Sequence, residues 1–418
     1  MMDRLTTKII FTGQTGIRKK EAIENLALYV LGKEAPQLFK NRAPDRLDLE
    51  NSKIRKIVAT FEVEEEIKNR MGSVPTFLDS SDEKSQKNAW KDSFQKIQNE
   101  IVSLKPKYAF VSMHATFFRR NRFFSLLDWD LIKDFNPDIF VTFIEEVFLI
   151  WRRVVRRESE EAPTASYFRL RDIVSWRSVE ILVTDLLSKF LSQETKESSL
   201  TNYVVAVKHP AKMFYRLLFE PDISKVYASF PISKTRNDPT KREMIDAFRM
   251  ALHDKYTVFD PLAIDEKVME ILLDKYFPKD KRAGLRSLSS SDELIFQRSD
   301  RWPLPVGFSL IEDDKEDYPI TLNAMEVQEV VQDVDQNIES RDFRLIDQSR
   351  CLCAWRPYYE QYPHQGVAAE INYARHIAKI SRHLYFPKED GDPQTSPFAA
   401  TGVFHSDLTK LYEALDKM

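Results

Sequence analysis

A glycine-containing loop near the N-terminus has the residue types of a phosphate-binding site. The apolar run Lys8–Phe11 is predicted to form a short buried strand, and a helix is predicted from about Lys20 to Leu31. Between them, Gly13, Gly16 and Lys19 match part of the pattern G-x-x-x-x-G-K-[ST]. A strand, a glycine loop and a helix N-terminus together present backbone N–H groups to an anion. The loop is therefore predicted to bind a phosphate; the alternative is an ordinary strand-to-helix turn.

Two residues of this loop depart from the pattern, and both departures weaken the case for magnesium-dependent phosphoryl transfer. Arg18 stands at the second pattern glycine and adds a long side chain where the loop normally curls around phosphate. Lys20 replaces the serine or threonine whose hydroxyl would bind Mg²⁺. The sequence thus predicts ATP or another nucleotide at an electropositive loop, without a magnesium site.

A single carboxylate in the second half of the chain is the other candidate for chemistry. The apolar run Cys351–Trp355 predicts a strand buried on both faces, and a helix is predicted to start at Gly366 with Glu370 in its first turn. Ligands of open α/β sheets bind at this end of the strands. The alternative is that Glu370 only complements the helix dipole. The apolar positions Ala368, Ile371, Ala374 and Ile377 are predicted to share one face of the helix. Glu370 is predicted to lie outside this face.

Gly366 suggests a tight turn or a close approach of a ligand, because the chain has only 9 glycines.

Composition limits the possible classes of protein. A length of 418 residues predicts two domains, and a formal net charge of −3 gives no bulk attraction to nucleic acid or to anionic membranes. The two cysteines, Cys351 and Cys353, lie on one predicted strand, so they are expected to be reduced core residues. No Cys/His cluster has zinc spacing, and no metal site is predicted. Without a long apolar segment, the chain is expected to be soluble and cytoplasmic, with no membrane partner.

Strands and helices alternate along both halves, which predicts an α/β fold. In the first half, strands are predicted at 108–113, 139–144 and 202–207, and in the second half at 226–230 and 257–259. We expect two three-layer domains, residues 1–221 and 222–418, each built on a parallel sheet.

Residues 7–220 resemble the archaeal-type adenylate kinases and related P-loop nucleotide kinases. The resemblance rests on the glycine loop, the strand ending in Ser112–Thr116, the Asn-Pro-Asp turn at 136–138 and the arginine pairs 152–153 and 156–157. It implies a kinase-like sheet in which Lys19 and the arginines hold phosphates. An acidic residue usual in the family is replaced by Ser112 or Met113. The implied nucleotide-binding residues are Gly13, Gly16, Arg18, Lys19, Arg153 and Arg157; the alternative for the arginines is a solvated helix face.

Residues 224–385 resemble the nucleoside 2-deoxyribosyltransferase family, which includes the nucleotide N-hydrolases. Three segments carry the resemblance: Val226–Ser233, Arg341–Ser349 and Gly366–Ala374. The resemblance implies a flavodoxin-like sheet and glycosidic chemistry at C1′ of a ribosyl or deoxyribosyl group, with no cofactor required. Glu370 would be the catalytic carboxylate.

The same resemblance implies the rest of the site. Asp342 would act as acid/base or hold the base or sugar; the alternative is an N-cap or loop carboxylate. His364 and Gln365 stand where the transferases carry an aspartate, which favours a nucleotide over a nucleoside substrate. Pockets of this family are often completed across subunits, so a homo-oligomer is expected. The expected substrate-binding residues are Tyr227, Ser229, Ser233, Lys234, Arg236, Arg356, His364 and Gly366.

Three functions follow from these interpretations. The first is an enzyme that cleaves or transfers at the N-glycosidic bond of a (deoxy)nucleotide, with a nucleotide-binding kinase-like domain attached. The second is a nucleotide kinase with a regulatory C-terminal domain. The third is a non-catalytic nucleotide sensor or scaffold.

Overall fold

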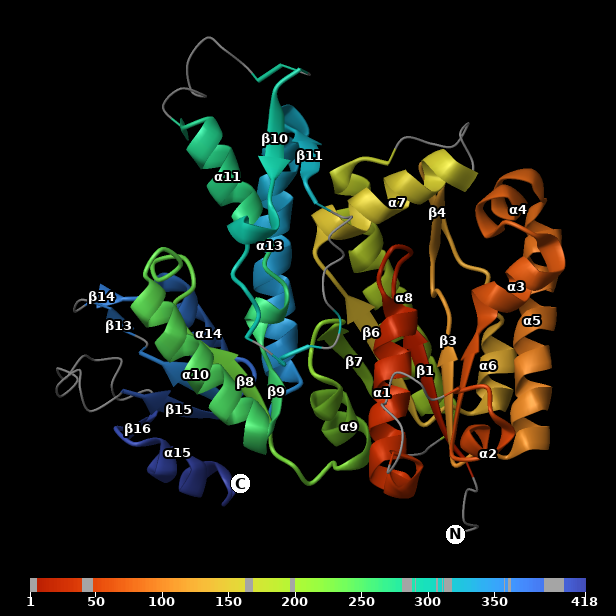
Figure 1. Ribbon diagram of the computed structural model, residues 1–418, viewed down its shortest axis with the longest axis horizontal. Coiled ribbons are helices and arrows are strands. Elements are labelled where there is room, and N and C mark those ends of the chain that lie inside the picture. The colour runs from red at the N-terminus through yellow and green to blue at the C-terminus, as the bar shows by residue number, and fades with distance from the viewer. Residues whose placement is uncertain are drawn as a thin grey trace.

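The protein is an α/β structure with two five-stranded parallel sheets flanked by helices (Figure 1). The computed structural model describes residues 6–39, 48–161, 168–195, 200–279, 288–289, 291–305, 307–309, 311, 318–356, 358–359, 362–386 and 402–418. Within these residues, no helix is long and apolar enough to span a bilayer.

The first sheet has the strand order β2-β3-β1-β6-β7, with all neighbours parallel. Its strands are β1 (Thr7–Thr12), β2 (Val58–Glu62), β3 (Tyr108–Ser112), β6 (Ile139–Ile144) and β7 (Asn202–Ala206). Successive side chains of a strand point to opposite faces. Ile9 and Phe11 accordingly pack with one core cluster, whereas Ile10 packs with another.

Helices cover both faces of this sheet. On the face of Ile9 lie α1 (Lys19–Glu34), α9 (Ala211–Phe219) and part of α7 (Val147–Glu161). On the face of Ile10 lie α5 (Glu83–Leu104), α6 (Trp129–Phe135) and the end of α8 (Leu170–Thr195). The remaining elements of this half are α2 (Ser52–Arg55), α3 (Val63–Met71), α4 (Val74–Ser80), β4 (Phe117–Arg119) and β5 (Arg122–Phe124).

The second sheet has the strand order β16-β15-β12-β8-β9, again with all neighbours parallel. Numbered along the chain from β8, this order is 2-1-3-4-5. Its strands are β8 (Lys225–Ser229), β9 (Thr257–Phe259), β12 (Cys351–Trp355), β15 (Ser381–Tyr385) and β16 (Val403–His405). The predicted strand Cys351–Trp355 is therefore present and lies at the centre of the sheet, with all five residues buried.

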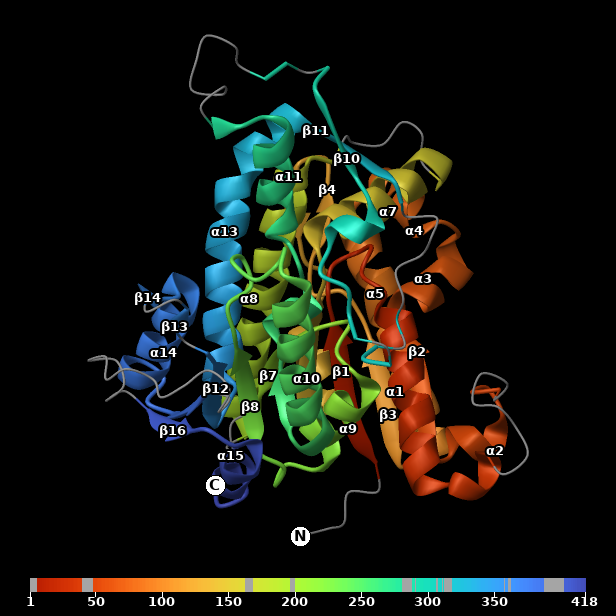
Figure 2. The same ribbon diagram turned by 60° about the vertical axis from the view of Figure 1, so that its left-hand side comes forward.

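Two pairs of helices flank the second sheet. One face packs against α10 (Pro239–Lys255) and α15 (Leu408–Leu415). The other face packs against α13 (Ala324–Asp347) and α14 (Gln365–His376). The N-terminal half of α13 extends beyond the second sheet. Beside it lie α11 (Val268–Tyr276) and the hairpin of β10 (Glu293–Phe296) and β11 (Ile320–Asn323), as Figure 2 shows. The short pair β13 (Tyr358–Tyr359) and β14 (Tyr362–Pro363) precedes α14.

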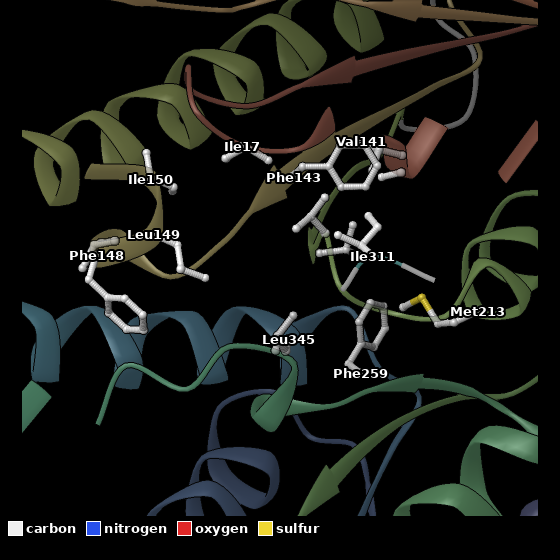
Figure 3. Packing of buried hydrophobic residues seen from close by; sticks show 14 of the residues in the cluster. Ile17, Val141, Phe143, Phe148, Leu149, Ile150, Met213, Phe259, Ile311 and Leu345 are labelled. Atoms are coloured by element: carbon white, nitrogen blue, oxygen red, sulfur yellow. The ribbon is translucent and has the colours of Figure 1, made fainter. Parts of the chain in front are cut away.

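One hydrophobic cluster extends through both halves of the chain. It joins the α1 and α9 face of the first sheet to the α13 and α14 face of the second. Figure 3 shows Phe143 and Leu149 from the first half near Leu345, Phe259 and Ile311 from the second. The predicted division at 221/222 falls between α9 and β8. The two sheets thus share a core rather than standing as isolated units.

Buried ion pairs accompany this shared core. Arg177 of α8 donates to Glu266 at 2.7 Å, and the two side chains are 4% and 0% exposed. Lys208, two residues after β7, lies 3.0 Å from Glu146, which also accepts from Arg301. Charges taken out of water are stable only when they are paired. The contact between the two halves therefore depends on this ionic network as well as on apolar packing.

Candidate active site

The Glu370 carboxyl is held by two hydroxyl groups of the second sheet. The Tyr227 hydroxyl donates to Oε1 at 3.0 Å, and the Ser229 hydroxyl donates to Oε2. Tyr227 and Ser229 are two residues apart on β8, so both side chains point to the same face of the sheet. Ser229 is the last residue of the strand, which places the carboxyl at the carboxyl end of a parallel sheet, where ligands of such sheets bind.

The helix that carries Glu370 differs in detail from the prediction. It begins at Gln365, not at Gly366, and Glu370 is its sixth residue, beyond the first turn. The buried positions are Val367, Ile371 and Ala374, whereas Ile377 is 65% exposed. Glu370 follows Val367 by three residues and precedes Ala374 by four, so it lies on the inward face rather than off it. The dipole alone does not explain this carboxylate.

A second carboxylate, Asp342, lies beside it. Asp342 is buried and is held by Arg341, whose Nε is 3.0 Å and whose terminal nitrogen is 2.9 Å from Oδ1. It lies inside α13, which runs on to Asp347, so it is neither an N-cap nor a loop carboxylate. Arg341 also donates to the carbonyl of Ile264 at 3.3 Å, which links the site to the segment after β9.

Burial and like charge change the protonation of the pair. Burial raises the pKa of Glu370 to about 8, and the negative charge of Asp342 adds to that shift, while the two hydroxyl donors oppose it. Burial also raises the pKa of Asp342, against the opposing charge of Arg341. The pKa of the Tyr227 hydroxyl lies well above its ordinary value because of burial and both carboxylates. A carboxyl whose pKa is shifted by burial and by a neighbouring charge is typical of a functional group.

The other predicted substrate residues divide into two groups. Ser233 and Lys234 are exposed in the loop after β8, and His364 is the half-buried N-cap residue of α14. Burial lowers the pKa of His364, and the charge of Lys234 adds to that shift. Within the described residues, His364 Nδ1 is buried without a hydrogen-bond partner.

Arg236, Arg356 and Gly366 have other surroundings. Arg236 is buried and forms a two-pronged pair with Asp265, at 2.8 and 2.5 Å. The Arg356 guanidinium lies over the Trp355 ring, 4.8 Å from its centroid. Gly366 is helical, and a Cβ there would meet its nearest neighbour at 3.9 Å, so no tight turn requires a glycine. A close approach of a ligand to Gly366 stays a prediction.

The glycine loop is filled by groups of the protein itself. Lys19 donates to the carbonyls of Gly13 and Met113 at 2.8 and 2.9 Å, and its Nζ is 2.8 Å from His114 Nδ1. Burial lowers the pKa of Lys19, against the charge of Glu64 and other carboxylates. An ammonium surrounded in this way is directed into the protein and not toward a ligand.

A carboxylate from α8 occupies the backbone donors beside the loop. Glu180 accepts from the N–H groups of Gly13, Ala115 and Thr116 at 2.9, 2.8 and 2.7 Å, and from the Thr116 hydroxyl at 2.6 Å. Glu180 is 1% exposed. Donors that converge on an anion are the feature that holds phosphate in such loops. Here the anion is supplied by the chain.

The remaining predicted nucleotide residues also have internal contacts. Arg153 donates to both oxygens of Glu145, at 2.7 and 3.1 Å, and to the carbonyl of Gly16 at 3.0 Å. Arg18 is the N-cap residue of α1 and lies 3.6 Å from Glu21. Gly16 has φ +89, and a Cβ would stand 2.9 Å from Val154, so α7 packs directly on the loop. Arg157 lines a pocket of about 250 Å³ with Glu64 and His114. In this arrangement the loop does not fit a nucleoside triphosphate.

Three residues that were not predicted from the sequence hold groups of these sites in place. Arg341 holds Asp342, Glu180 fills the donors of the glycine loop, and Glu64 accepts from the backbone of His114 at 2.9 Å. Burial raises the pKa of Glu64 to about 7, against the charge of Lys19. A glutamate inside the largely apolar stretch Val174–Leu187 is the signal that could have indicated Glu180.

Among the described residues, no group of three or more His, Cys, Asp or Glu side chains could hold a metal ion. Comparison of the chain with models of protein families gives no match, and comparison with curated proteins gives none either.

Proposed function

We propose that the chain is a nucleotide-processing enzyme whose C-terminal half cleaves or transfers at the N-glycosidic bond of a (deoxy)nucleotide. The observation that carries the proposal is the Glu370 carboxyl, held by Tyr227 and Ser229 at the carboxyl end of a parallel sheet and placed beside Asp342. The strand order 2-1-3-4-5, found in flavodoxin-like doubly wound folds, also supports it.

The chemistry follows from the charge that develops at the sugar. When the C1′–N bond breaks, the base leaves with the bonding electrons and C1′ becomes positively charged. The Glu370 carboxylate opposes that charge or bonds to C1′. Water in a hydrolase, or a second base in a transferase, completes the reaction. Asp342 either holds the base or sugar, or acts as acid/base by giving a proton to the leaving base and taking one from the incoming water or base. Arg341 keeps Asp342 in place.

Two residues, Lys234 and His364, favour a phosphorylated substrate. The charge of Lys234 lowers the pKa of His364, the N-cap residue of α14, and His364 Nδ1 has no hydrogen-bond partner among the described residues. A cation, a ring nitrogen and helix N–H groups together suit an anion such as a 5′-phosphate. The proposal includes a homo-oligomer, on the resemblance alone.

The test is a panel of nucleosides, nucleotides and NAD incubated with the protein, with free base separated by chromatography. We expect base release from at least one nucleotide, with or without ATP. Phosphorylation of a nucleotide by ATP, without base release, would favour the nucleotide kinase. Tight nucleotide binding without either reaction would favour the sensor.

Replacement of Ser229 by alanine should weaken catalysis without removing it. Ser229 positions one oxygen of Glu370 and lowers its pKa by donating a hydrogen bond. We expect Ser229→Ala to reduce kcat/KM about tenfold, equivalent to about 1.4 kcal/mol, the scale of one hydrogen bond to a charged group. The pH at which activity appears should also rise. An unchanged pH profile would show that Ser229 acts only in packing.

A further inference from the structure

A pocket beside the edge strand β2 lies far from Glu370 along the chain. It has a volume of about 600 Å³, within the range of sites for small organic ligands. Residues of α1, β2, α3 and α5 line it. Its apolar wall includes Ile23, Leu28, Phe61 and Ile97. A wall of this kind accommodates methylene groups.

The rim of this pocket is strongly acidic. Seven carboxylates line it, against two basic residues, Lys20 and Arg55. Arg55 is already paired with Glu100 at 2.7 Å. Within the described part of the chain, Glu24, Glu62 and Glu65 form no ion pair. Burial raises the pKa of Glu24, the charge of Lys20 opposes that shift, and the charge of Glu62 adds to it. The site therefore attracts cations and repels phosphates.

A buried hydroxyl supplies an independent indication of a ligand. Ser112, the last residue of β3, lines the pocket and is 3% exposed. Its Oγ is buried and has no hydrogen-bond partner among the described residues. Buried polar groups are nearly always satisfied, and an unsatisfied one that lines a pocket is explained by a bound partner in that pocket. A hydroxyl oxygen can accept from an ammonium group.

We propose that this pocket binds a linear aliphatic polyamine. Its ammonium groups would be neutralised by the Glu24, Glu62 and Glu65 carboxylates, and its methylene groups would lie on the apolar wall. The size of the pocket and the apolar wall favour an organic cation over a bare metal ion. So does the absence, among the described residues, of a metal-binding group. The proposal does not depend on glycosidic chemistry at Glu370.

Isothermal titration calorimetry with spermidine, on the full chain at fixed ionic strength, tests this assignment. The double variant Glu24→Gln/Glu65→Gln should weaken binding about tenfold or more, because it removes two of the three carboxylates that would neutralise the ammonium groups. Ser112→Ala should weaken it severalfold. The matched control is Glu243→Gln/Glu339→Gln, which removes the same charge at exposed positions of α10 and α13.

The results separate a built site from general attraction. Unchanged binding in the control, with weaker binding in both pocket variants, supports the assignment. Equal weakening of spermidine binding in the control double variant would show that binding depends only on net charge, and it would contradict a site in the pocket. Displacement of spermidine by MgCl₂ at the same ionic strength would identify a divalent-cation site, and absence of binding would overturn the proposal outright.

Discussion

Glu370→Gln is expected to lower the rate of base release by about 10³-fold, because a neutral amide neither bonds to C1′ nor opposes its positive charge. The loss should appear mainly in kcat, since the carboxylate interacts most strongly with the transition state. The measurement is base release under saturating substrate, on the nucleotide that wild type cleaves best.

Folding of this variant should not be impaired, which keeps the result interpretable. The amide oxygen of glutamine can still accept from one of the two hydroxyls, and its NH₂ group can donate to the oxygen of the other. The substitution also removes a carboxyl whose raised pKa disfavours the charged form in the folded protein. At pH 9 we therefore expect the midpoint of thermal unfolding to be no lower than that of wild type. Glu339→Gln, at an exposed position of α13, is the control and should retain full activity. Equal rates for Glu370→Gln and wild type would leave Glu370 with a structural role only.

Arg177→Met is expected to lower the free energy of unfolding by about 3–5 kcal/mol, the cost of breaking a buried ion pair from one side. Arg177 connects α8 to Glu266 in the segment between β9 and α11. Without it, the fully buried Glu266 keeps the Val147 N–H at 2.9 Å and a distant Arg341 nitrogen at 3.9 Å. Urea denaturation followed by circular dichroism measures the difference.

The chain provides a matched control on the same helix. Arg171 also lies on α8, is 64% exposed and pairs with Asp333 at 3.1 Å. Arg171→Met should cost less than about 1 kcal/mol, as exposed pairs do. The double variant Arg177→Met/Glu266→Gln should be more stable than Arg177→Met alone, because it also removes the stranded charge. Equal losses for Arg177→Met and Arg171→Met would show that the ionic network contributes little to the contact between the halves.

The position of Glu370 was predictable because it depends on local order in the chain. An apolar run, a loop and a helix place a carboxylate at the end of a strand, and the structure has all three. Its orientation was not predictable in the same way. The inward face of α14 begins at Val367, whereas the predicted stripe began one residue later, at Ala368. Glu370 lies one turn after Val367, so it was missed when the stripe was counted from Ala368.

Contacts between distant segments set the rest of the site. The hydroxyls that hold Glu370 come from β8, 143 and 141 residues earlier. In the glycine loop, the local pattern indicated Lys19. The direction of the Lys19 side chain, however, depends on Met113 and His114, which follow another strand. The Gly13 N–H donates to Glu180, which lies 167 residues later in the chain. Periodicity and spacing carry no information about such partners.

The pH dependence of base release tests most directly whether Glu370 is the reacting carboxylate. Only its ionised form can attack or stabilise C1′, and its pKa is raised to about 8, so kcat/KM should rise with pH through about 8. In Asp342→Asn, which removes the neighbouring negative charge, the rise should move to lower pH. A rate that is independent of pH between 6 and 9 in both proteins would contradict the assignment of Glu370 as the reacting group.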